Sequence, residues 1–228
     1  MVDDSLLQTR PLERDEEFRF RCGPDLSCFT DCCSQIDLAL SPYDVLRLRQ
    51  GLGIGATEFL DRYVVVEKEE EAAFPQAYLA LVDDERFSCP FVTSQGCSIY
   101  QDRPGACRTY PLGRGARRTE DGTVIDFYVL ISEEHCRGFA ENQTQTSAAW
   151  LADQGLQPYN EFNDLTLQLL QHPRIRAGFR PDAGLMERFL RLLYDPLSLR
   201  LERPDAPADE EQLLRLAHEI LYNELSET

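Results

Sequence analysis

The chain has 228 residues, of which 43% are hydrophobic and eight are cysteines. This length and composition allow a substantial buried core, either in one domain with an appendage or in two small domains. Lys and Arg number 23 against 40 Asp and Glu, so the net charge of −17 disfavours nucleic acid and anionic membrane surfaces as partners.

Residues 1–17 read as a charged N-terminal segment. Asp3 and Asp4 lie where a secretory signal would need apolar residues, and no stretch approaches the eighteen apolar residues that span a bilayer. We therefore expect a cytoplasmic protein. In that compartment clustered cysteines are more typical of a metal site than of disulfides, although eight thiols would suit four disulfides in a secreted chain.

The first group of thiols is Cys22, Cys28, Cys32 and Cys33. The intervening Gly-Pro-Asp sequence at 23–25 predicts a turn-rich loop, which lets sulfur ligands converge from short sequence distances. Neighbouring side chains in an extended segment point to opposite sides. Cys32 and Cys33 can therefore serve two centres, or one can bind metal while the other packs as a small apolar residue.

Ser41-Pro42 predicts the start of a helix that runs to about Gln50 and ends at the glycines of 51–55. Thr57 is expected to cap a second short helix, to residue 63. Strands are expected at 63–67 and 77–82, on either side of the acidic run at 67–71, which reads as a solvated loop.

The second group of thiols begins with Cys89, Cys97 and Cys107. Gly96 is expected to take a positive φ beside Cys97, and residues 104–105, Pro-Gly, are expected to form a turn beside Cys107. Both features can deliver a thiolate with backbone N–H groups facing its sulfur.

Cys136 completes the second group, after a strand predicted over 122–131 that starts at an Asp-Gly turn. His135 can replace a thiolate in a mixed site, or it can simply face solvent. From residue 144 the pattern becomes helical, with helices expected at 144–154, 158–171, 181–194 and 208–225. The last of these carries an apolar stripe typical of core packing. His172 and His218 receive no role.

Arginine residues lie close to the cysteines in sequence, although the chain is acidic elsewhere. Four thiolates around a divalent ion leave excess negative charge, which arginine or backbone N–H groups can compensate. The alternative is pairing with the abundant Asp and Glu. For Arg114, Arg117 and Arg118 the choice is between an anion site and a solvated basic loop. The complete set is Arg19, Arg21, Arg103, Arg108, Arg114, Arg117, Arg118 and Arg137.

These motifs, taken in order, resemble the CxxCxxCC family, the zinc- or iron-chelating cysteine-cluster domain of the YkgJ type. The resemblance covers Phe18 to Gly138, and the first block departs from the family pattern because it reads C-x5-C-x3-C-C, so that either Cys22 or Cys28 can be the first ligand. The matching motifs are Cys28 to Cys33, Ser41 to Leu48, Cys89-Pro90-Phe91, Gly96 to Tyr100, Arg103-Pro104, Cys107-Arg108 and Tyr110-Pro111-Leu112.

The resemblance implies a centre of zinc or iron, with an iron–sulfur cluster favoured, and it implies that the matching cysteines are the ligands. Flagellin lysine N-methylase is a relative with a similar cysteine domain. The eight thiols suffice for two four-ligand centres, or for one centre with spare cysteines. The predicted ligands are Cys22, Cys28, Cys32, Cys33, Cys89, Cys97, Cys107 and Cys136.

The sequence as a whole predicts an α+β protein. Residues 18–142 are expected to form an irregular metal-binding cysteine domain with short strands, and 143–228 a mostly helical C-terminal region. The leading interpretation is an iron–sulfur protein with a redox or group-transfer role. The alternatives are a zinc-stabilised protein-interaction module and a lysine N-methylase-like enzyme. The partner or substrate is not indicated by the sequence.

Overall fold

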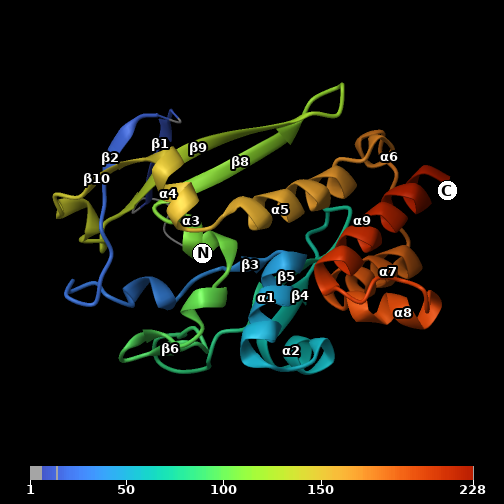
Figure 1. Ribbon diagram of the computed structural model, residues 1–228, viewed down its shortest axis with the longest axis horizontal. Helices are drawn as coiled ribbons and strands as arrows, with labels where there is room; N and C mark the ends of the chain where they lie inside the picture. The colour runs from blue at the N-terminus through green and yellow to red at the C-terminus, as the bar shows by residue number, and fades with distance from the viewer. Residues whose placement is uncertain (1–6, 14, 228) are drawn as a thin grey trace. The chain divides into compact units, whose positions relative to one another are not determined.

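The computed structural model describes residues 7–13 and 15–227, and the predicted N-terminal segment therefore lies partly outside the described residues. The chain divides into two compact units. Unit 1 comprises residues 1–36 and 81–158, and unit 2 comprises residues 37–80 and 159–228. All eight cysteines belong to unit 1. Antiparallel strands and helices occur in both units, which confirms the α+β class (Figure 1).

In its described residues, unit 1 contains strands of two to ten residues, two α-helices and three 3-10 turns. The strands are β1 (Leu7–Leu12), β2 (Glu17–Arg19), β6 (Val92–Thr93), β7 (Gly96–Cys97), β8 (Leu112–Arg118), β9 (Val124–Glu133) and β10 (Thr144–Thr146). The helices are α3 (Gly105–Thr109) and α4 (Ser147–Asp153), with 3-10 turns η2 (Asp31–Cys33), η3 (Tyr100–Asp102) and η4 (Gly138–Ala140).

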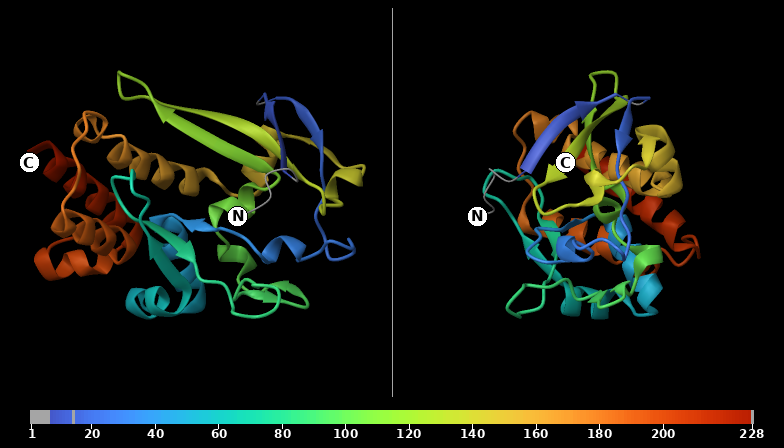
Figure 2. Two further views of the ribbon diagram at one scale, coloured as in Figure 1. Left: turned by 180° about the vertical axis from the view of Figure 1, so that it is seen from behind. Right: turned by 90° about the vertical axis from the view of Figure 1, so that its left-hand side faces the viewer.

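The main sheet of unit 1 has the order β1-β9-β8, and both pairings are antiparallel. Strands β8 and β9 form the long hairpin that is visible in both views of Figure 2. The register places Leu112 opposite Leu130, and because side chains opposite each other share a face, both reach the same core. That core consists of Leu12, Phe18, Phe20 and Leu112, with Tyr110, Leu130, Cys136, Phe139, Trp150 and Leu151 packed against it.

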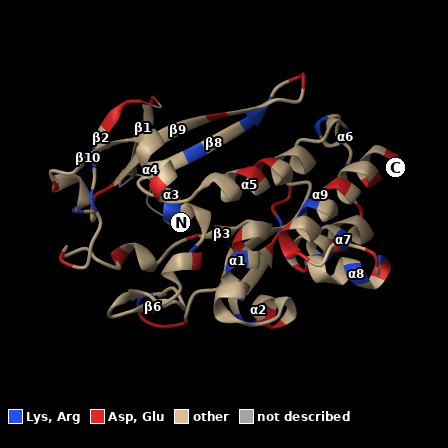
Figure 3. Ribbon diagram, viewed as in Figure 1, with Lys and Arg blue, Asp and Glu red and all other residues tan. Residues whose placement is uncertain are grey.

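Three local predictions for unit 1 are wrong. The basic loop predicted around Arg114 is strand β8, and its arginines are visible along that strand in Figure 3. Residues 104–105 begin helix α3 instead of forming a turn, with Pro104 as its N-cap. The helix predicted from residue 144 starts at Ser147, because residues 144–146 pair with β2 as strand β10.

Unit 2 contains a small sheet of order β3-β5-β4 and most of the helices. Its strands are β3 (Ala39–Leu40), β4 (Val64–Glu67) and β5 (Gln76–Leu79). Its helices are α1 (Pro42–Leu52), α2 (Ala56–Tyr63), α5 (Gln157–Leu170, whose first two residues belong to unit 1), α6 (Pro173–Arg176), α7 (Ala183–Tyr194), α8 (Leu199–Glu202) and α9 (Glu210–Glu227), with the 3-10 turn η5 (Pro196–Ser198).

Local sequence signals explain the first helix of unit 2. The Ser41 hydroxyl accepts a hydrogen bond from the Asp44 backbone N–H at 3.2 Å, while the Asp44 carboxylate accepts one from the Ser41 N–H at 2.8 Å. Gly53 ends the helix at a φ of 67°. The prediction for the next helix is wrong in one detail, because Gly55 and not Thr57 is its N-cap. The apolar stripe of α9 is buried as predicted.

Candidate metal centre

The first cysteine block is an irregular chain of turns. Backbone hydrogen bonds join Asp31 N–H to the Cys28 carbonyl and Cys33 N–H to the Thr30 carbonyl, both at 3.0 Å. Thr30 takes a φ of 70°, and η2 then carries Cys32 and Cys33 as neighbours in a tight turn. The block thus presents its thiols from a compact loop, as its turn-forming residues predict.

The second block is built on the β6–β7 hairpin. Val92 pairs with Cys97 across it, and the Val92 N–H donates to the Cys89 carbonyl at 3.1 Å, so the hairpin holds Cys89 and Cys97 in one small region. Gly96 has the predicted positive φ, 107°. A Cβ at Gly96 would lie 2.9 Å from the Phe29 ring, which shows that the first block rests against this hairpin.

Backbone contacts join the two blocks beside Cys33 and Cys89. The Cys89 N–H donates to the Cys33 carbonyl at 2.7 Å, and Ser34 and Ser88 form an antiparallel bridge. The Gln35 N–H donates to the carbonyl of Phe87 at 3.0 Å. These contacts place residues from two distant stretches of the sequence side by side.

Cys136 meets the first block through the segment that follows it. The Arg137 N–H donates to the Cys28 sulfur at 3.2 Å, and the Arg21 N–H donates to the Gly138 carbonyl at 3.1 Å. A Cβ at Gly138 would lie 2.6 Å from the Arg21 carbonyl oxygen, so only glycine allows this close approach. The role of Gly138 was not predicted from the sequence.

All eight cysteines are free thiols. Cys22, Cys32 and Cys107 are exposed, and the other five are half-buried. Within residues 7–13 and 15–227, no three Cys, His, Asp or Glu side chains already form a group that could hold a metal ion. The thiols therefore share one region without being arranged as a finished coordination shell.

Burial and neighbouring thiols raise the pKa of several of these cysteines. Burial is the main cause at Cys22, and the charges of Cys32, Cys28 and Cys136 raise its pKa further. At Cys33 the largest cause is its hydrogen bond with Cys32, which raises the pKa of Cys33 and lowers that of Cys32. These thiols therefore lie close enough for their charges to interact, without three of the described ones forming a coordination group.

The arginines divide between the two roles considered for them. Burial raises the pKa of both Cys22 and Cys97, and the positive charge of Arg103 offsets part of each increase. The Arg103 guanidinium lies 3.7 Å from the centre of the Tyr100 ring. Arg21 instead pairs with Asp25 at 2.6 Å and Glu141 at 3.0 Å. Arg103 therefore supplies positive charge to the thiols, whereas the charge of Arg21 is already balanced by carboxylates.

Other basic side chains near the cysteines have structural contacts. Arg108 donates to the carbonyls of Arg103 and Gln154, both at 3.0 Å. Arg114 pairs with Asp126 at 3.3 Å. His135, considered as a substitute for a thiolate, lies 3.7 Å from the Glu133 carboxylate.

Tyr110 is a neighbour of the thiols whose role sequence reasoning missed. Its buried hydroxyl lies beside Cys136 and makes no well-aligned hydrogen bond within the described part of the chain. Burial, and then the interaction with Cys136, raises the pKa of Tyr110. Burial in turn raises the pKa of Cys136, and the Tyr110 hydroxyl and the Gly138 N–H offset part of that increase. A hydroxyl in this position can stabilise a thiolate.

The donor set fits zinc or iron. Both metals bind cysteinate sulfur, and outer hydrogen-bond donors then orient and stabilise the ligands. Here the Arg137 N–H already donates to a sulfur, and the buried Tyr110 hydroxyl lies ready to do so at Cys136. The fit lies in donor chemistry and neighbourhood, because the sulfurs do not yet form a coordination group.

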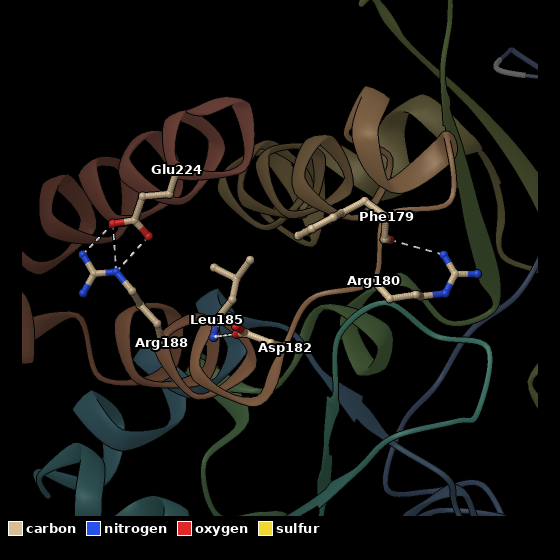
Figure 4. A pocket seen from close by; sticks show the side chains of 6 residues that line it. All are labelled: Phe179, Arg180, Asp182, Leu185, Arg188 and Glu224. Carbon is tan, nitrogen blue, oxygen red and sulfur yellow. Dashed lines mark hydrogen bonds and ion pairs between the residues drawn. The ribbon is translucent and has the colours of Figure 1, made fainter. Parts of the chain in front are cut away.

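Unit 2 offers a different kind of hollow, of about 370 Å³. Figure 4 shows that Arg188 points across it to Glu224, at 2.7 Å, and Arg188 also pairs with Glu202 at 3.1 Å. The positive charge of Arg188 is therefore balanced by carboxylates of the protein itself. The hollow is lined by Phe179, Arg180, Asp182, Leu185, Arg188 and Glu224.

The fold and these contacts define an α+β protein with a thiol-rich region suited to metal binding. The chain belongs to the CxxCxxCC family, described as "Putative zinc- or iron-chelating domain", which matches residues 21–145, more than half of its length. The family resemblance inferred from the motifs is thus confirmed, as is metal binding in general. No curated protein and no solved structure gives a significant match. Among the described helices, none has the length and apolar character needed to cross a bilayer.

Proposed function

We propose that the protein binds an iron–sulfur centre through these cysteines in the cytoplasm and serves a redox or group-transfer reaction. The observation that carries the proposal is the gathering of eight free thiols in unit 1 with Cys22, Cys32 and Cys107 exposed. A centre held by these ligands lies at the surface, within reach of a partner or substrate. When bound, such a cluster supplies one-electron transfer.

The surrounding residues support a negatively charged centre. Arg103 brings positive charge close to Cys22 and Cys97, and the backbone N–H of Arg137 donates to Cys28. Fixed donors and charges of this kind stabilise thiolate ligands and tune a cluster's potential. Reduced thiols also persist in the cytoplasm, where the glutathione and thioredoxin systems oppose disulfide formation.

A zinc-stabilised interaction module is the second candidate, favoured by the small core beside the thiols. Four side chains, Leu12, Phe18, Phe20 and Leu112, form the buried cluster there. A bound metal contributes directly to folding free energy when ligands that are far apart in sequence must be held together. Zinc would then fix the loops of unit 1, and function would reside in its surface.

Protein purified without oxygen distinguishes the two candidates. A brown protein with iron and inorganic sulfide in proportion supports the iron–sulfur centre, whereas a colourless protein with stoichiometric zinc supports the module. Individual Cys→Ser variants at 28, 32, 89, 97 and 107 should lower the amount of bound metal. The matched control is Ser94→Ala, at the exposed tip of the β6–β7 hairpin that carries Cys97. If none of the five variants loses metal, the ligand assignment is wrong.

A further inference from the structure

The backbone contacts separate the eight cysteines into two neighbourhoods. One forms where the first block meets the segment after Cys136. The other forms where the end of the first block meets the β6–β7 hairpin. Backbone hydrogen bonds define both neighbourhoods, although no three thiols among the described residues already form a coordination group.

The first neighbourhood contains Cys22, Cys28 and Cys136. The Cys28 sulfur accepts a hydrogen bond at 3.2 Å from the backbone N–H of Arg137, the residue that follows Cys136. The backbone N–H of Arg21, which precedes Cys22, donates to the Gly138 carbonyl at 3.1 Å. The ring centres of Phe20 and Phe139 lie 5.2 Å apart. The chain on both sides of these cysteines is therefore held together by backbone and ring contacts.

The second neighbourhood contains Cys33, Cys89 and Cys97, with Cys107 close by. The Cys89 N–H donates to the Cys33 carbonyl at 2.7 Å, and the hairpin pairs Val92 with Cys97. Cys107 follows in α3, which begins three residues after η3 ends, and its charge acts on Cys33. None of these contacts involves the segment after Cys136.

Cys32 and Cys33 stand at the junction, as consecutive residues of η2. Assigning Cys32 to the first neighbourhood and Cys33 to the second gives four sulfurs to each. We propose that the thiols form two four-sulfur metal centres, the first from Cys22, Cys28, Cys32 and Cys136 and the second from Cys33, Cys89, Cys97 and Cys107. This inference rests on the proposed function, because it requires that the cysteines bind metal.

Most of the electrostatic interactions between the thiols fall within one of the two sets. The pKa of Cys136 is affected by Cys28, and that of Cys22 by Cys32, Cys28 and Cys136. In the second set, Cys89 is affected by Cys97, and Cys33 by Cys89 and Cys107. Cys32 is the exception, because it interacts with Cys22 of its own set and also with Cys33, Cys89 and Cys97 of the other.

Four cysteinates are the complete ligand set of a structural zinc ion and of a cubane cluster. Two such sets account for all eight thiols and leave none spare. The division also explains why two cysteines are adjacent in a chain whose other cysteines are at least three residues apart.

The test is the metal content of the full chain, purified without oxygen, for pairs of Cys→Ala variants. Cys136→Ala and Cys97→Ala should each halve the bound metal relative to the unchanged protein. A second substitution within the same set, Cys22→Ala on Cys136→Ala, should cause no further loss. Combining the sets, Cys136→Ala with Cys97→Ala, should remove all of the metal, and iron, zinc and sulfide are all measured.

Each outcome decides between the interpretations. If the within-set and cross-set pairs lose the same amount of metal, one shared centre exists and the division is wrong. If the unchanged protein holds no metal, the proposed function itself fails. Emission from Trp150 and far-ultraviolet circular dichroism show whether a variant is folded. For a set whose variant is unfolded, Cys22→Ala or Cys107→Ala, at exposed positions, takes its place.

Discussion

Replacing Gly138 by alanine tests whether a close backbone contact assembles the thiol region. The added Cβ would lie 2.6 Å from both the Arg21 carbonyl oxygen and a carbon of the Phe20 ring. The second distance is about 0.9 Å inside the ~3.5 Å optimum for two carbons. Overpacking of this kind costs roughly 1–3 kcal/mol, and losing the hydrogen bond from Arg21 adds about 1 kcal/mol.

We therefore expect Gly138→Ala to lower the free energy of unfolding of unit 1 by about 2 to 4 kcal/mol. To relieve the clash, the segment at Gly138 has to move away from Arg21, which separates Cys136 from Cys22 and Cys28. The amount of bound metal should therefore fall as well. Urea unfolding followed by the emission of Trp150, the only tryptophan of the chain, measures the first effect because this ring packs on Phe20. Elemental analysis measures the second.

Gly184→Ala is the matched control for this experiment. Its Cβ would find its nearest neighbour, the Asp182 carboxylate, at 3.5 Å, and a helical glycine-to-alanine change stabilises by roughly 0.5–1 kcal/mol. If Gly138→Ala keeps full stability and full metal content, the close approach does not hold the site together and the reasoning is refuted.

Three further perturbations have defined outcomes. Ser41→Ala should destabilise by about 1 kcal/mol in urea unfolding, because it removes the hydroxyl that accepts from Asp44, and an unchanged midpoint would contradict this. Tyr110→Phe should keep the metal but lower the reduction potential of an iron–sulfur centre, since it removes the hydroxyl beside Cys136; equal potentials in redox titration would disprove the contact. Burial lowers the pKa of His218 to about 4, so that, as the pH falls, this histidine is protonated in the unfolded chain before it is protonated in the folded protein. Stability should fall by about 3 kcal/mol as pH drops from 6.5 to 4, and His218→Gln should lack this part of the pH dependence.

The elements with strong local signals could be predicted from the sequence. The capping pair Ser41 and Asp44 and the terminating Gly53 specify α1 within a few residues, because each supplies a hydrogen bond or a φ that the helix end requires. Strand β8 could not be predicted in this way. Its Gly113, Gly115 and three arginines have weak strand preference, and it is a strand because its backbone pairs with β9 along its full length.

The candidate site likewise has features that could be predicted from the sequence and features that could not. Cysteine spacing indicated metal chemistry and the residues to examine, since thiols in two blocks are a property of the sequence. Which thiols share a neighbourhood depends on contacts between residues far apart in sequence, such as the Ser34–Ser88 bridge. Neither Tyr110 nor Gly138 belongs to the cysteine pattern, so only the fold shows that they face Cys136 and Arg21.

The junction between the blocks is also where the backbone is strained. Gln35 and Phe87 take φ values of 54° and 47°, and left-handed backbone costs a residue other than glycine roughly 1–2 kcal/mol. The Gln35 N–H donates to the Phe87 carbonyl, and the Ser34–Ser88 bridge and the Cys89-to-Cys33 hydrogen bond lie directly beside them. Strain of this kind persists only where surrounding contacts hold it, and it concentrates at functional sites. Metal bound by Cys33 and Cys89 would hold these two strained segments together. Metal binding at the proposed second centre would thus offset the free-energy cost of the strained backbone beside it.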